Sequence, residues 1–173
     1  MIRFLHAADF HDWHGPGSPW ETVAWPENVH VFRENALTGA EVPELDLVIH
    51  GAAFTGPEQP ESLLAGFAAP ADGRCHIGLL HGELDGTEER YDPLRREEVT
   101  ASGLNYLALG HVHKRTAPLT LGRTVCAWPG CPEGRGFDEL GEKGFYQGTV
   151  TDDGQVELNF VPFARHRYEI LEV

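Results

Sequence analysis

The sequence of 173 residues is poor in cysteine and has no long hydrophobic run. Three cysteines are too few, and odd in number, for a disulfide framework, so we expect unpaired thiols in a reduced compartment. No apolar run approaches the roughly 20 residues of a membrane span, and the start MIRFLHAAD lacks the basic region and long apolar core of a signal peptide. We therefore expect a cytoplasmic protein that does not interact with a membrane.

Basic residues are also scarce. Lysine and arginine number 13 against 27 aspartates and glutamates, which gives a net charge of −14. A domain that binds nucleic acid without a partner usually has a surface rich in lysine and arginine. If DNA is the substrate, metal ions or a partner subunit must supply most of the attraction. A solubilising acidic surface is the plainer interpretation of this charge.

The sequence is 41% hydrophobic and 23% charged, which is typical of a globular protein. Its length suits a single domain spanning 1–173. Short apolar runs bounded by turn residues favour strands at 2–8, 29–32, 45–54, 76–81, 104–109, 124–128, 144–150, 155–163 and 167–173. Two segments favour helices, 61–68 and 92–102. In the second, Asp92 is the expected N-cap, Pro93 the first helical residue and Gly103 the stop.

The order of these elements predicts an α/β fold. The alternation of strands and helices gives an α/β part, 1–123, which carries the chemically interesting residues. The part that follows, 124–173, contains strand candidates without helices and is expected to be mainly antiparallel. No internal repeat or long linker separates the two parts.

Histidines and an aspartate follow several predicted strands, namely Asp9, His11, His81, His111 and His113. The carboxyl ends of strands in an open α/β sheet converge on one crevice, so these side chains are expected to meet. In an extended segment, residues two apart point to the same side, and each D-x-H or H-x-H pair can present two ligands together. A lone histidine would more often be structural, but two spaced pairs indicate a site for Mn, Fe or Zn.

The segments that carry these residues, IRFLHAADFH, IGLLHGE and LALGHVHKR, resemble the calcineurin-like metallophosphoesterases. The likeness is closest to the SbcD-type DNA repair exonuclease branch, and it extends to the downstream stretch WPGCPEGRGFDELGEKG. The resemblance implies a metallophosphoesterase-like β-sandwich flanked by helices, here in shortened form.

The resemblance also implies two metal ions, often manganese, with iron or zinc as alternatives. Asp9, His11 and His113 would hold the first ion, and His81 and His111 the second. Two such ions lower the pKa of a bound water and neutralise charge that develops on phosphate during attack. The number of ions that this chain holds, one or two, is left open.

Two family motifs, G-D-x-x-D and an intact G-N-H-D, have no counterpart in the sequence. The stretch HAADFHDWHGPGSPW is therefore interpreted as two half-motifs joined at His11 by an internal deletion. Asp12 could replace the missing bridging aspartate, and His14 could act as an acid or a ligand. His11 and Asp12 are thus the catalytic candidates. The plainer interpretation makes Asp12 and His14 exposed loop residues.

The resemblance implies a phosphoesterase that hydrolyses phosphodiester bonds by metal-activated water, with DNA or another phosphoester as substrate. The alternative is a degenerate, non-catalytic member of the family that serves as a binding or structural subunit. Expected partners are an SbcC-like ATPase and a second copy of the chain, since a homodimer would cover a sheet edge exposed by the deletion.

Other side chains have two interpretations each. Arg135 could contact a phosphate or form a structural salt bridge. His50 lies in VIHGAAF, which resembles a segment of the family, although a hydrogen-bonded core histidine is the plainer expectation. His6 is expected to be a core residue or a group that orients a metal ligand. Trp13, Trp20 and Trp25 lie in or near a Pro/Gly-rich loop and could stack on bases, although packing in the core or within the loop is the plainer expectation.

Overall fold

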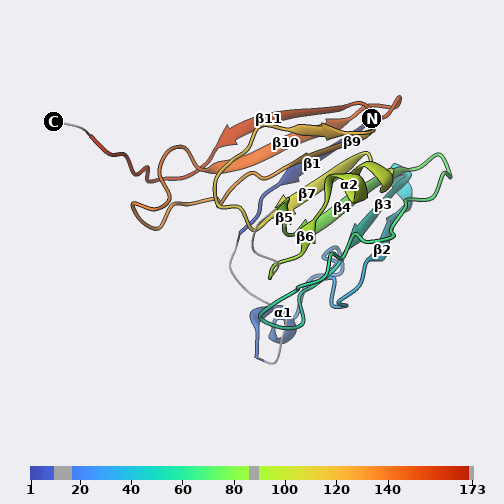
Figure 1. Ribbon diagram of the computed structural model, residues 1–173, viewed down its shortest axis with the longest axis horizontal. Coiled ribbons are helices and arrows are strands. Elements are labelled where there is room, and N and C mark those ends of the chain that lie inside the picture. Colours follow the sequence, from blue (N-terminus) through green and yellow to red (C-terminus); the bar gives the residue numbers. More distant parts are fainter. Residues whose placement is uncertain (10–16, 86–89, 172–173) are drawn as a thin grey trace.

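The computed structural model describes residues 1–9, 17–85 and 90–171, in which two β-sheets pack face to face (Figure 1). The larger sheet has the strand order β2-β3-β4-β7-β9-β8, the smaller has β1-β10-β11, and β5 and β6 form a separate pair. The strands are β1 (Ile2–His6), β2 (Thr38–Val42), β3 (Leu47–Gly51), β4 (Cys75–His81), β5 (Glu83–Leu84), β6 (Pro93–Leu94), β7 (Tyr106–Gly110), β8 (Leu119–Leu121), β9 (Thr124–Ala127), β10 (Gly144–Val150) and β11 (Val156–Pro162), and the helical elements are α1 (Pro19–Thr22), the 3-10 turn η1 (Pro43–Leu45) and α2 (Arg96–Ala101). The predicted α/β fold with a β-sandwich is confirmed.

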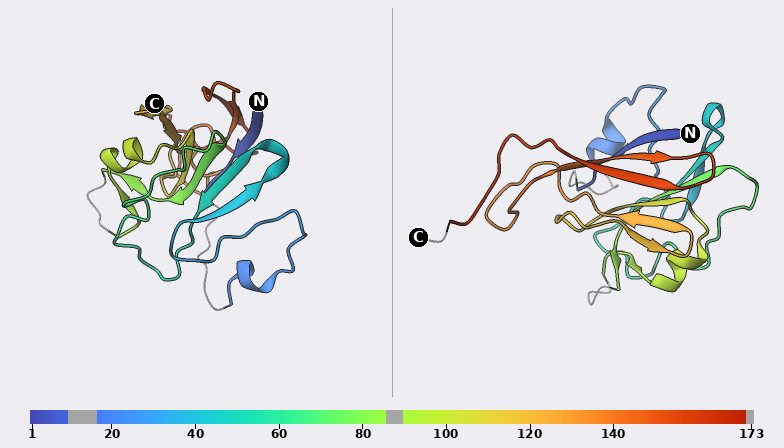
Figure 2. Two further views of the ribbon diagram at one scale, coloured as in Figure 1. Left: turned by 90° about the vertical axis from the view of Figure 1, so that its right-hand side faces the viewer. Right: turned by 90° about the horizontal axis from the view of Figure 1, so that it is seen from above.

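The first hydrophobic core lies between the two sheets. Ile2 of β1 and Val150 of β10 contribute from the smaller sheet, and Ile77, Tyr106 and Ala108 contribute from the larger one. Alternate residues of each strand point to the same face, so β1 presents Ile2 to this core. The two sheets appear as separate layers in the second view of Figure 2.

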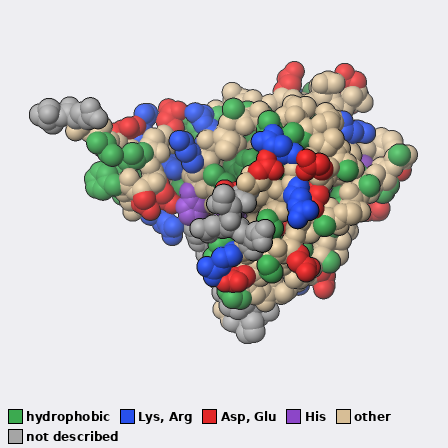
Figure 3. All heavy atoms as spheres, in the orientation of Figure 1, with side chains coloured by type: hydrophobic (Ala, Val, Ile, Leu, Met, Phe, Trp, Pro, Cys, Tyr) green, Lys and Arg blue, Asp and Glu red, His purple; other side chains and the backbone are tan. Residues whose placement is uncertain are grey.

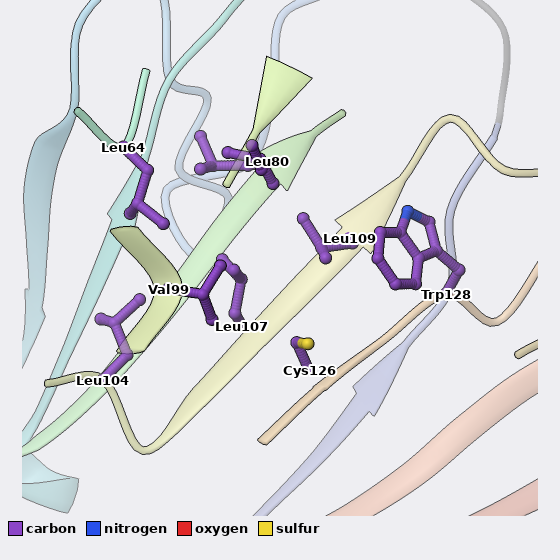
Figure 4. Close-up of a cluster of buried hydrophobic side chains, with 9 residues drawn as sticks. Leu64, Leu80, Val99, Leu104, Leu107, Leu109, Cys126 and Trp128 are labelled. Atoms are coloured by element: carbon purple, nitrogen blue, oxygen red, sulfur yellow. The ribbon is translucent and has the colours of Figure 1, made fainter. Parts of the chain in front are cut away.

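The second core covers the opposite face of the larger sheet, beneath α2 and its neighbouring loops (Figure 4). Val99 of α2 packs there with Leu107 and Leu109 of β7, and Trp128 closes one end. Strand β7 is thus buried on both faces, which explains why its sequence YLALG is apolar throughout instead of alternating.

Four strands of the larger sheet, β3, β4, β7 and β9, run parallel to one another. Their carboxyl ends therefore lie at one edge of the sheet, where His81 pairs in register with Gly110. The segments that leave these strands meet at that edge, as expected for an open α/β sheet.

The order of strands in space differs from their order along the chain. Strand β1, from the first residues, pairs with β10, whereas β9 lies beside β7 in the larger sheet. Both sheets therefore contain strands from before and after residue 123. The alternating apolar residues of β1 complete the inner face of the smaller sheet, from which Phe4 packs against Tyr106 of β7 with 4.8 Å between ring centroids and 35° between the ring planes.

Some strand predictions were wrong. Residues 29–32 and the described part of 167–173 form no strand. Most of 167–171 is exposed, as are residues 29–30, whereas residues 31–32 are half-buried. Conversely, β2 and β8 were not predicted, because TGAEV is partly polar and LTL has only 3 residues. Both are antiparallel edge strands, whose pairing comes from a neighbour instead of from an apolar run of their own.

Both helix predictions need correction. Residues 61–68 form turns, and the second helix, α2, begins at Arg96 instead of directly after Asp92. Asp92 caps no helix, because its Oδ1 accepts the backbone N–H of Leu63 at 2.7 Å and ties the 59–64 segment to β6. The predicted stop at Gly103 is confirmed, with φ of +65°. No helix within the described residues is long and apolar enough to cross a membrane.

His6 is a core residue at the end of β1. Its Nδ1 lies 2.8 Å from the hydroxyl oxygen of Tyr106, and the side chain is buried. Burial lowers the pKa of His6 from 6.5 to about 4, because the charged imidazolium loses its hydration. His6 is therefore neutral in the folded protein at ordinary pH.

This burial predicts a pH-dependent stability. Because the pKa of His6 is lower in the folded state than in the unfolded state, its stabilising contribution is complete above pH 6.5 and is lost as the pH falls toward 4. The expected loss from this residue is about 3 kcal/mol. Urea unfolding between pH 7.5 and 4 should show a shallower dependence in a His6→Gln variant, which does not titrate. An equal slope in both proteins would contradict the assignment.

Candidate functional site

A cleft of about 870 Å³ opens at the carboxyl ends of the parallel strands. Four of the predicted metal residues line it, namely Asp9, His81, His111 and His113. Apart from His30, the other lining side chains are mainly apolar and aromatic and are here called the aromatic wall; they include Trp20, Val29, Val31, Phe32, Phe54, Pro57, Leu79 and Tyr91. The cleft thus combines a polar wall of ionisable side chains with a wall suited to flat or apolar groups.

Asp9 follows β1 and is the acidic residue of the polar wall. Its carboxylate has no solvent exposure, and its Oδ1 accepts the backbone N–H of His111 at 2.6 Å. Its Oδ2 is buried and has no hydrogen-bond partner within the described residues. A buried, charged oxygen that lacks a donor is costly. A cation bound beside Asp9 would remove that cost.

His81 and His111 lie next to this carboxylate. The Nδ1 of His81 is 4.0 Å from Oδ1 of Asp9, and the two imidazole rings meet edge to face at 5.4 Å. Phe54 packs against His81 at 5.6 Å and Tyr91 against His111 at 5.1 Å, measured between ring centroids. The two aromatic rings hold the imidazoles in place at the rim of the cleft.

The backbone at the end of β7 is shaped for this close approach. A Cβ atom on Gly110 would lie 2.9 Å from Nδ1 of His81 and 3.4 Å from Oδ1 of Asp9. Gly110 is needed for space, whereas the positive φ of the turn, +91°, belongs to His111. A positive φ is rare outside glycine, and such strain is concentrated at functional sites.

His113 is held by a residue that the sequence did not suggest. Its Nδ1 donates to Oε1 of Glu139 at 2.7 Å, and the Glu139 side chain is only 5% exposed. Burial opposes the charge on Glu139, but the backbone N–H of Arg135 and the His113 ring outweigh it and keep the pKa below its usual value. The signal for Glu139 was present in the stretch WPGCPEGRGFDELGEKG, but nothing in it distinguished one acid from the others.

The described side chains do not by themselves complete a metal site. Among residues 1–9, 17–85 and 90–171, no three His, Cys, Asp or Glu side chains converge closely enough to hold one ion. A catalytic-type site normally needs three protein ligands. Of the predicted residues, His11, Asp12 and His14 lie outside the described part of the chain. The donors that are described, a carboxylate and imidazoles, have the chemistry expected for Mn, Fe or Zn.

Arg135, the predicted phosphate contact, is not among the described residues that line the cleft. Its backbone N–H donates to Oε2 of Glu139 at 2.8 Å, and its Nη2 is 3.9 Å from Oε1. The guanidinium side chain is 65% exposed. Arg135 therefore helps to fix Glu139, and a phosphate contact stays a prediction.

The remaining predictions concern structural residues. His50 is buried and bonds through Nε2 to Nδ1 of His76 at 2.9 Å, which confirms it as a core residue. The three cysteines are unpaired thiols, as expected. Trp20 and Trp25 stack on each other at 5.2 Å between ring centroids with 16° between their planes, so they pack within their loop, and Trp13 lies outside the described residues.

No protein-family model matches the chain. The chain is similar to a Bacillus subtilis (strain 168) protein named Uncharacterized metallophosphoesterase YhaO, with 33% identity over 155 residues. The similarity covers 83% of this chain but only 36% of that protein, so the chain spans about a third of its relative's length. Identity of this extent, over most of a chain whose histidines and Asp9 gather at the strand ends, shows that the chain belongs to the metallophosphoesterases.

Proposed function

We propose that this chain hydrolyses phosphoesters with a divalent metal ion held on the polar wall of the cleft. The observation that carries the proposal is the Asp9 carboxylate, which is buried beside His81 and His111 with an unpartnered Oδ2 within the described residues. A cation bound beside this carboxylate would offset the cost of burying an oxygen that lacks a hydrogen-bond donor. Membership of the metallophosphoesterases supports the same conclusion.

Each residue of the polar wall has a distinct task in this proposal. Asp9 supplies the anionic ligand and is oriented by the backbone N–H of His111. His81, His111 and His113 supply neutral imidazole nitrogens, and His11 and Asp12 are proposed as the further ligand and the bridging acid. The bound ion would acidify a water and neutralise charge on the phosphate. Manganese is the proposed ion, with iron or zinc as alternatives.

The substrate is a separate part of the proposal. Resemblance to SbcD-type exonucleases favours DNA, and the aromatic wall of the cleft could stack on an unpaired base. However, the described residues that line the cleft include neither lysine nor arginine. On the face shown in Figure 3, basic and acidic side chains are interspersed. Binding of DNA would therefore require help from an SbcC-like ATPase or a second copy of the chain, whereas a small phosphoester would not.

A second candidate function is a non-catalytic binding or structural subunit of the same fold. It is favoured by the lack of three convergent metal-ligating side chains within the described part of the chain. Such a protein would keep the cleft and could retain one weakly bound ion. Metal binding and turnover must therefore be measured separately.

Metal binding tests the site directly. Manganese(II) should stabilise the protein against thermal unfolding, by about 2.7 kcal/mol at one hundred times its dissociation constant. The Asp9→Asn variant should lose this stabilisation because it lacks the anionic ligand. Asp152→Asn is the control, since its carboxylate is exposed and distant in sequence. Equal stabilisation of the Asp9→Asn variant would contradict the proposed site.

Turnover tests the reaction and its substrate. With manganese(II), the protein should hydrolyse bis(p-nitrophenyl) phosphate, and His81→Ala and His111→Ala should each reduce the rate by about 100-fold or more. Linear DNA and p-nitrophenyl phosphate are assayed in parallel to separate an exonuclease from a small-molecule phosphatase. Tight metal binding without hydrolysis of any of the three substrates would favour the non-catalytic candidate.

A further inference from the structure

We infer that Glu139 is a positioning residue that sets the orientation and the tautomer of His113, so that the Nε2 atom of His113 faces the metal. This inference rests on the proposed function, because it assigns His113 as a ligand. It adds a residue from the 130–143 segment to a site otherwise built from strand ends.

The contact between Glu139 and His113 is short and well fixed. Oε1 of Glu139 lies 2.7 Å from Nδ1 of His113. The other carboxylate oxygen, Oε2, accepts the backbone N–H of Arg135 at 2.8 Å. Because both oxygens are engaged and the side chain is buried, the carboxylate cannot rotate away from the imidazole.

The chemistry of the contact determines which nitrogen binds a metal. An ionised carboxylate only accepts hydrogen bonds, so Nδ1 of His113 must carry the proton. In a neutral imidazole the lone pair is then on Nε2. A histidine that holds a metal usually donates its other N–H to a carboxylate or carbonyl, which fixes the ring and increases its basicity. The Glu139–His113 pair has this arrangement, and His113 lines the cleft.

The same segment also holds the backbone of His113. The carbonyl oxygen of His113 accepts a hydrogen bond from Nζ of Lys143 at 3.0 Å and another from the backbone N–H of Cys131 at 3.3 Å. A Cβ atom on Gly130 would lie 2.6 Å from this oxygen, so only glycine allows the approach. His113 is thus held at its ring and at its carbonyl by residues 130–143.

A purely structural role for Glu139 makes a different prediction. In that case Glu139 would only stabilise the 130–143 segment, and its replacement would lower stability without changing the imidazole or the affinity for metal. The positioning role predicts a change at His113 itself, which can be seen before any metal is added. The two roles therefore differ in a spectroscopic signature.

The test uses the Glu139→Gln variant of the whole chain, labelled with ¹⁵N-histidine. In the metal-free protein at pH 8.5, imidazole ¹⁵N shifts should show the Nδ1–H tautomer for His113, identified by its loss in His113→Gln. In Glu139→Gln this signal should move toward the Nε2–H tautomer. Affinity for manganese(II) should fall about 10- to 100-fold.

The matched control is Glu133→Gln. Glu133 contacts Nδ1 of His166 through Oε1 at 2.9 Å, but both side chains are well exposed and lie outside the cleft lining. This variant should leave the His113 signal and the manganese affinity unchanged. If Glu139→Gln does not fold, Glu139→Asp keeps the charge, shortens the reach by one methylene, and should show the same changes to a smaller degree.

The outcomes separate the inference from the proposed function. An unchanged His113 tautomer, or unchanged manganese affinity, in a folded Glu139→Gln variant overturns the positioning role. Failure of the unaltered protein to bind manganese overturns the proposed function and the metal-directed part of the inference together. In that event a tautomer change in Glu139→Gln would still support control of the His113 ring by Glu139.

Discussion

The hydrogen bond from the backbone N–H of His111 to Oδ1 of Asp9, 2.6 Å long, joins the two sheets at the edge where the cleft opens. Asp9 follows β1 of the smaller sheet, and His111 follows β7 of the larger sheet, 102 residues later. The bond brings the end of β1 over His81, and Gly110 leaves the room that this approach needs. Both residues of the bond have positive φ angles, so the surrounding packing must hold them there. The polar wall of the cleft depends on this connection.

Two buried carboxylates organise the histidines, and they do so differently. Oδ1 of Asp9 accepts a hydrogen bond from a backbone N–H, and Oδ2 has no partner among the described residues. An oxygen without a partner suits a residue that binds the metal directly. Both oxygens of Glu139 accept hydrogen bonds, one from a backbone N–H and one from the His113 ring. This arrangement suits a residue that orients a metal ligand and does not bind the metal itself. In a protein of net charge −14, additional buried negative charge is unfavourable unless a cation compensates it. This balance is the physical basis for the proposed position of the ion near Asp9.

The parts of the fold that were predicted correctly are those with strong local signals. β7 and β4 are apolar runs between turn residues, and each was predicted to within about two residues of its bounds. The edge strand β2 was missed because its pairing partner, not its own sequence, makes it a strand. Asp92 illustrates the opposite error. It has the residue type of an N-cap and precedes a proline, but its carboxylate bonds to Leu63, 29 residues earlier in the chain.

The sequence by itself determined that histidines and Asp9 follow strands, and it carried the likeness to the metallophosphoesterases. Strand ends can be recognised locally, since apolar runs and turn residues lie within a few positions of each other. Only the tertiary structure decided that Nδ1 of His113 forms a hydrogen bond and that its partner is Glu139. It also decided that the positive φ at the end of β7 belongs to His111 and not to Gly110. These features depend on hydrogen-bond direction and on contacts between residues 26 or more positions apart, and no local pattern encodes either.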